Sequence, residues 1–172
     1  MTALTLCLDF EASGIGQHTF PIEVAVADPT SGEVQSWLIR PTPEWLAVGV
    51  WDKAAEAVHG LTVERITAEG LSVEQVTEAL TNVAYGARVL SDSPGHDGHW
   101  LRTLYSATGV NNPPFALQDF HHFAWACATR VGRRPDIAFV KAETEAAVRF
   151  PVTHRAGADA RHNAEILRQL SG

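Results

Sequence analysis

The chain has 172 residues, about the length of one domain, and 45% of them are hydrophobic, so it is long enough to bury its own core. Its formal net charge of −7 argues against a broad basic surface for long duplex nucleic acid. Because no apolar stretch approaches the length of a membrane span and no basic region precedes an apolar block at the N-terminus, we predict no membrane segment and no signal peptide. Cys7 and Cys127 are too few for a zinc knuckle or a disulfide framework, and we expect reduced thiols in a cytoplasmic protein.

The first part of the chain is predicted to form three strands and a short helix. Leu4–Leu8 is an apolar run, and Ile22–Ala27 and Glu33–Ile39 follow it with strand-like composition. Turn-forming residues at 28–32 separate the second and third strands, so these two are expected to pair as an antiparallel hairpin. A short helix is predicted over Trp51–Val58.

The rest of the chain is predicted to interleave helices with two short strands. The clearest helix begins at Ser72, which can cap it, and carries apolar residues at helical spacing. The predicted helices are Ser72–Ala84, Asp97–Thr108, Asp119–Val131, Asp136–Arg149 and Asp159–Leu170, and the predicted strands are Arg88–Ser91 and Leu117–Gln118. This order indicates an α/β layered fold, and because no long linker divides the chain we expect one domain over residues 1–172.

Two carboxylates stand at the end of the first predicted strand. Asp9 and Glu11 are two residues apart, so their side chains share one face of the strand while Phe10 points to the other. Like charges on one face of a buried strand are costly unless something neutralises them. A divalent cation that prefers oxygen ligands would do so, and the pair therefore predicts part of a metal site.

Two later segments contain further candidate ligands. Asp97 stands at the start of a predicted helix after the Arg88–Ser91 strand, and Asp92 is a competing acid on the same stretch. His154 lies in a predicted loop, and Asp159 lies in the first turn of the last predicted helix. An acid at a helix start is most often a cap, and a loop histidine is most often a surface residue, so neither segment alone indicates a site.

Together, the three segments resemble the DEDDh family of 3′→5′ exonucleases, which includes oligoribonuclease, RNase T and the proofreading subunit of the bacterial replicative polymerase. Residues 9–14 read DFEASG, which is similar to the first family motif DxExTG with serine in place of threonine. Asp97 followed by Trp100 and Leu101 resembles the second motif, an aspartate followed by an apolar helix. Residues 154–160 read HRAGADA, which matches the third motif HxAxxDA, and residues 59–62 read HGLT, which resembles the family element HGI followed by T or S.

The resemblance implies a fold, a metal site and a reaction. The implied fold is the α/β RNase H-like fold, with a mixed five-stranded sheet flanked by helices. Two Mg²⁺ or Mn²⁺ ions would be held by four carboxylates, namely Asp9, Glu11, Asp97 and Asp159, and such oxygen ligands suit these cations better than zinc. His154 would be the general base that takes a proton from the attacking water. The implied reaction is 3′→5′ hydrolysis of single-stranded RNA or DNA, with release of nucleoside 5′-monophosphates.

The resemblance also suggests contacts with substrate and partners. Ser13 and Gly14 would bring backbone groups close to the terminal nucleotide, where glycine has no side chain to obstruct it. His59 would contact the 3′ end, and Arg155 would meet a phosphate. A homodimer is compatible with the resemblance, because family members are often dimers. Two alternatives stay open: a hydrolase of short oligonucleotides or dinucleotides, which the acidic charge favours, and a catalytically inactive nucleic-acid-binding module on the same fold.

Overall fold

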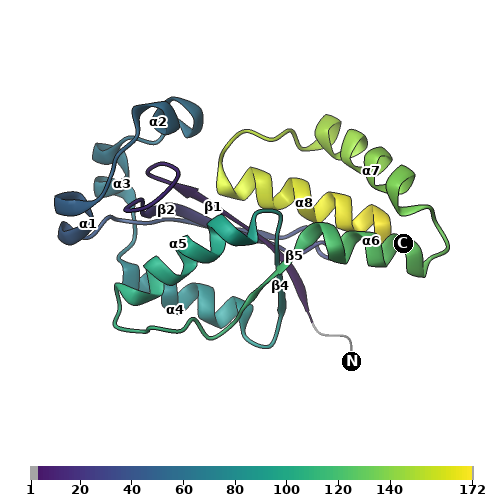
Figure 1. Ribbon diagram of the computed structural model, residues 1–172, viewed down its shortest axis with the longest axis horizontal. Coiled ribbons are helices and arrows are strands. Elements are labelled where there is room, and N and C mark those ends of the chain that lie inside the picture. Colours follow the sequence, from purple (N-terminus) through teal and green to yellow (C-terminus); the bar gives the residue numbers. More distant parts are fainter. Residues whose placement is uncertain (1–3, 172) are drawn as a thin grey trace.

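The computed structural model describes residues 4–171, and its centre is a mixed sheet covered by helices on both faces (Figure 1). The order across the sheet is β3-β2-β1-β4-β5, and the strands are β1 Thr5–Ala12, β2 Pro21–Ala27, β3 Val34–Leu38, β4 Arg88–Ser91 and β5 Leu117–Asp119. The first three strands pair antiparallel, and the expected hairpin between the second and third is confirmed. β4 pairs parallel to β1, and β5 pairs parallel to β4.

The helices form three groups around the sheet (Figure 1). Their bounds are α1 Pro43–Val48, α2 Lys53–His59, α3 Val63–Glu69, α4 Val73–Ala84, α5 Pro94–Ser106, α6 Phe120–Arg130, α7 Pro135–Arg149 and α8 Ala156–Ser171. The short helices α1 to α3 gather near one end of β1 and β2, whereas α4 and α5 lie apart from α6, α7 and α8. Among the described helices, none combines the length and the apolarity needed to cross a membrane.

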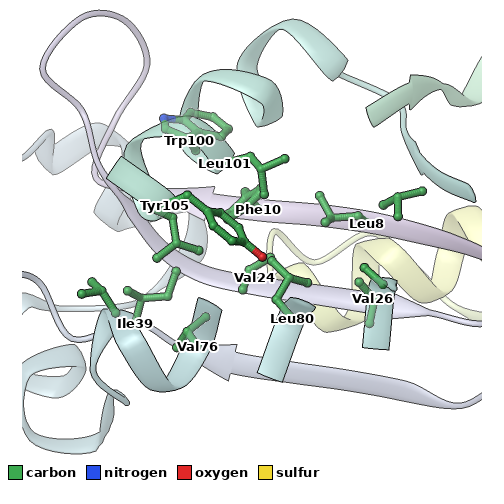
Figure 2. Packing of buried hydrophobic residues seen from close by; sticks show 14 of the residues in the cluster. Leu8, Phe10, Val24, Val26, Ile39, Val76, Leu80, Trp100, Leu101 and Tyr105 are labelled. Carbon is green, nitrogen blue, oxygen red and sulfur yellow. The ribbon is translucent and has the colours of Figure 1, made fainter. Parts of the chain in front are cut away.

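Alternation along β1 separates two hydrophobic cores, one on each face of the sheet. Leu8 and Phe10 point toward α4 and α5 and pack there with Leu80 and Tyr105 (Figure 2). The opposite face is lined by smaller residues, and the alanines of α8 let this helix pack close to the sheet. Because side chains alternate along β1 as far as Glu11, Asp9 and Glu11 share the face that α8 covers.

The structure adds two short helices to the sequence prediction and moves the bounds of several elements. β1 continues four residues beyond Leu8, because its backbone stays paired with β2 through the acidic positions. α1 and α3 were not predicted; each is only six or seven residues long and begins after a threonine whose side chain accepts a backbone N–H. α5 begins at Pro94, since proline is tolerated in the first turn of a helix, and α8 begins at Ala156. Asp97 and Asp159 therefore lie at the end of a first helical turn rather than at a cap.

Candidate metal centre

The first group of acids joins β1 to the start of α8. Asp9 and Glu11 face α8 from β1, where they pair across to Ala25 and Glu23 of β2. Asp159 comes from the first turn of α8. Carboxylate oxygens of Asp9, Glu11 and Asp159 all lie within 4.8 Å of one another. The pleat of β1 and the first turn of α8 thus bring together three acids, although Asp9 and Asp159 are 150 positions apart in the sequence.

A second group shares Asp9 and reaches across to β4 and α5. Carboxylate oxygens of Asp9, Asp92 and Asp97 also lie within 4.8 Å of one another. Asp97 is buried at only 2% exposure, and the hydroxyl of Ser91 donates a hydrogen bond to its Oδ2. The four acids predicted as ligands therefore converge around Asp9. Asp92, which the sequence presented only as a competing acid, converges with them.

Burial and mutual repulsion raise the pKa values of these acids. Burial is the largest cause for Asp9, whose pKa lies well above its usual value, and Asp97 and Glu11 add to the rise. Burial followed by the charge of Asp159 raises the pKa of Glu11 to about 8. Burial also raises the pKa of Asp97 to about 7, although the Ser91 hydroxyl opposes the shift. Ionising all of these acids together is therefore costly unless a cation neutralises their charge.

His154 is held beside Asp159 by the loop that precedes α8. The backbone N–H groups of Thr153 and His154 donate hydrogen bonds of 2.9 and 3.1 Å to the two carboxylate oxygens of Asp159. His154 has a φ of 54°, in the left-handed region that few residues other than glycine adopt. Asp9, His154 and Asp159 line the same hollow of about 300 Å³. The loop geometry thus brings an exposed imidazole to the wall of the acidic site.

Ser13 and Gly14 are packed into the loop that follows β1. The Ser13 hydroxyl accepts a hydrogen bond of 3.0 Å from the Phe20 backbone N–H, and its backbone N–H donates to the Phe20 carbonyl. A Cβ atom at Gly14 would lie 2.9 Å from the Cβ of Asp52. The fold of this loop therefore requires a hydroxyl at position 13 and a glycine at position 14, independently of any contact that the backbone makes with a substrate.

His59 is buried at the end of α2 with one nitrogen unsatisfied. Its Nδ1 accepts a hydrogen bond of 3.0 Å from the Leu61 backbone N–H, whereas Nε2 has no hydrogen-bond partner among the described residues. Burial lowers the pKa of His59, so the ring is neutral near pH 7. With Nδ1 acting as acceptor, the proton lies on Nε2, which leaves a buried donor free for another group.

Arg155 forms a two-pronged ion pair that sequence analysis did not predict. Its Nε and Nη2 atoms donate hydrogen bonds of 2.9 and 2.8 Å to the carboxylate of Glu23, which is buried on β2. The Ala156 backbone N–H donates to the same carboxylate at 3.1 Å. Glu23 therefore fixes the start of α8 to the sheet. A second residue that the sequence did not reveal is Asn163, whose side chain binds Asp92.

Helices on both faces of a mixed sheet, with β4 and β5 parallel to β1, define an α/β fold that is shared with exonucleases of the RNase H-like class. No family model matches the sequence, and a search of curated proteins found no relative. Solved structures do match. Escherichia coli exonuclease I in complex with a dT13 oligonucleotide is 15% identical over 73% of this chain and 30% of that chain, with a TM-score of 0.58.

Two further structures of exonuclease I give the same result. The zinc-ion-bound form of the E. coli enzyme with single-stranded DNA is 15% identical over 74% of this chain and 30% of that chain, with a TM-score of 0.59. A product-bound exonuclease I is 15% identical over 74% of this chain and 32% of that chain, also with a TM-score of 0.59. The chain thus spans about a third of these enzymes. The predicted RNase H-like fold, a mixed five-stranded sheet flanked by helices, is confirmed.

Proposed function

We propose that this chain is a metal-dependent 3′→5′ exonuclease acting on single-stranded nucleic acid, RNA or DNA, and releasing nucleoside 5′-monophosphates. The observation that carries the proposal is the convergence of two acidic groups on Asp9, with His154 on the wall of the same hollow. The proposal is supported by the similarity of this fold to that of exonuclease I, which has been solved in complex with oligonucleotides. We extend the proposal to the whole chain as one exonuclease domain, residues 1–172.

The donor set fits two Mg²⁺ or Mn²⁺ ions. All candidate ligands are carboxylates, which these cations prefer, and the raised pKa values of Glu11 and Asp97 mark a site that gains stability when a cation replaces the protons. Asp9, Glu11 and Asp159 would hold one ion, and Asp9 with Asp97 would hold the other. When bound, the ions supply Lewis-acid stabilisation of the attacking and leaving oxygens in phosphodiester hydrolysis.

His154 is the proposed general base. The backbone N–H of His154 donates to Asp159, which anchors this residue of the loop at the wall of the hollow. Imidazole is a common general base in enzymes, and the attacking water would give its proton to this ring. Asp9, Glu11, Asp97 and Asp159 would hold the cations beside this ring.

Four residues are proposed to contact the substrate. The backbone of Ser13 and Gly14 would approach the terminal nucleotide, and the unsatisfied Nε2–H of His59 would donate a hydrogen bond to its 3′ end. Arg155 keeps its bond to Glu23 while one-third of its side chain is exposed, so it would meet a phosphate from a fixed position. Since both cysteines are free and buried, we propose a reducing, cytoplasmic location; a homodimer stays a proposal based on family resemblance.

A second candidate is a hydrolase of short oligonucleotides or dinucleotides. It is favoured by the net charge of −7, because a long strand needs many phosphate contacts and an acidic surface supplies few. The two candidates share one site and differ only in substrate length.

One set of assays tests both candidates. End-labelled single-stranded RNA, single-stranded DNA and dinucleotides are incubated with Mn²⁺ or with EDTA, using wild type, Asp9→Asn and, as a matched control, Glu143→Gln. Glu143 lines the same hollow but belongs to neither acidic group, so its loss should leave hydrolysis within about twofold. We expect stepwise shortening from the 3′ end with Mn²⁺ only, abolished in Asp9→Asn. Hydrolysis of none of the substrates would refute both candidates and favour the inactive binding module.

A further inference from the structure

We propose that Asp92 is a fifth carboxylate of the metal centre and a direct ligand of the cation held between Asp9 and Asp97. The inference rests on the proposed function, because it presumes that cations occupy the site. Asp92 follows the last residue of β4, and its carboxylate lies on the same hollow as Asp9 and His154. It would change the second cation site from two carboxylates to three.

The three acids are close enough together to bind one and the same cation. Oxygens of Asp9, Asp92 and Asp97 lie within 4.8 Å of one another. Oxygen ligands stand about 2.0–2.6 Å from Mg²⁺ or Ca²⁺, so two of them on one ion lie no more than about 4–5 Å apart. The side chains therefore need little movement to share an ion of this size.

The second site is poor in free oxygens without Asp92. Asp9 also belongs to the group with Glu11 and Asp159, so its charge is divided between two positions. Asp97 already accepts a hydrogen bond from Ser91 at Oδ2, which occupies part of its carboxylate. A cation held by these two acids alone would depend heavily on water and substrate. A third carboxylate supplies the missing negative charge.

Asp92 is positioned for this role although it is exposed. The side-chain amide of Asn163, which is buried on α8, donates a hydrogen bond of 3.0 Å to Oδ2 of Asp92. This bond ties the end of β4 to α8 and leaves Oδ1 for a cation.

The extra charge has a consequence for binding. Five carboxylates carry one more negative charge than two divalent cations neutralise, so both ions should bind before nucleic acid is present. The wild-type protein should therefore bind two Mn²⁺ ions in the absence of any oligonucleotide. Without Asp92, the second ion should bind tightly only when a substrate phosphate helps to hold it.

The test is a titration with Mn²⁺ alone, in which the free ion is counted by its electron paramagnetic resonance signal. Asp92→Asn keeps an acceptor for Asn163 and removes the charge, and Glu143→Gln removes one charge from the wall of the same hollow. We expect Asp92→Asn to weaken the second Mn²⁺ site by about tenfold or more and to spare the first, whereas Glu143→Gln should change neither by more than about twofold. Asn163→Ala, which frees the Asp92 side chain, should give a smaller loss at the second site.

Two results would overturn the inference. If Asp92→Asn binds both ions as tightly as Glu143→Gln does, Asp92 is not a ligand; hydrolysis by the wild-type protein would then leave the proposed function standing. If the wild-type protein binds no Mn²⁺ and hydrolyses nothing, the inference and the proposed function fail together. Thermal unfolding of each variant with EDTA shows whether the fold is intact, so a binding loss is not mistaken for unfolding.

Discussion

Asp97→Asn should stabilise the metal-free protein, although it removes a proposed metal ligand. Burial raises the pKa of Asp97 from 3.8 to about 7, so ionising it in the folded state is costly. A tenfold change in a protonation constant corresponds to about 1.4 kcal/mol, which makes the full cost about 4 kcal/mol at pH 8. Asparagine is neutral and still accepts a hydrogen bond from Ser91. We therefore expect a gain of about 2–4 kcal/mol in the free energy of unfolding at pH 8.

The pH dependence of this gain follows from the direction of the pKa change. The pKa of Asp97 is raised in the folded state, so protonated Asp97 makes its full contribution to the free energy of unfolding below about pH 4. That contribution is lost as the pH rises through 7. The gain from Asp97→Asn should fall to about 1–2 kcal/mol at pH 5. His59, whose pKa is lowered, acts in the opposite direction, but it is present in both proteins and cancels in the difference.

Urea unfolding followed by the fluorescence of the five tryptophans measures the effect, with EDTA and then with saturating Mg²⁺. With Mg²⁺ the advantage of Asp97→Asn should shrink by about 2–3 kcal/mol, because the wild type gains more from the cation than the variant does. Glu143→Gln controls for the loss of one negative charge near the hollow. The reasoning is refuted if Asp97→Asn destabilises the metal-free protein, or if its gain is the same at pH 5 and pH 8.

Three other predictions concern the base, the buried ion pair and the cations. His154→Asn, which tolerates the left-handed backbone, should lower kcat/KM by about 10²–10⁴ and leave Mn²⁺ binding unchanged within about threefold; near-wild-type turnover would remove His154 from the role of base. Glu23→Gln should lower the free energy of unfolding by about 2–4 kcal/mol, because Arg155 and the Ala156 N–H lose a charged acceptor, and a change below about 1 kcal/mol in urea unfolding would contradict this. Mg²⁺ at about a hundred times its Kd should raise the melting temperature by about 5–10 °C, and no shift at millimolar Mg²⁺ or Mn²⁺ would count against the metal site.

The sequence determined the parts of this protein that depend on local periodicity and on chain order. Alternation along one strand was enough to put Asp9 and Glu11 on a common face with Phe10 on the other, and the structure bears this out, since Phe10 packs in the core on one face of the sheet while Asp9 and Glu11 lie together with Asp159 of α8. The hairpin after β1 followed from its turn residues, and the longer helices followed from apolar spacing. The order of acidic motifs indicated which distant residues to compare, and the fold places Asp97 and Asp159 beside the first pair.

The tertiary structure decided which neighbours these acids have. Asp92 and its partner Asn163 are separated by 71 positions in the sequence, and Glu23 and its partner Arg155 by 132 positions. No periodic pattern in the sequence predicts pairs so far apart. They exist because α8 crosses the sheet close to β1 and β2, a packing that depends on its alanines and on the whole chain. Local periodicity fixes the direction of a side chain within its own strand or helix. Only the packing between elements determines which charged side chains lie next to one another, and the chemistry of this site depends on that arrangement.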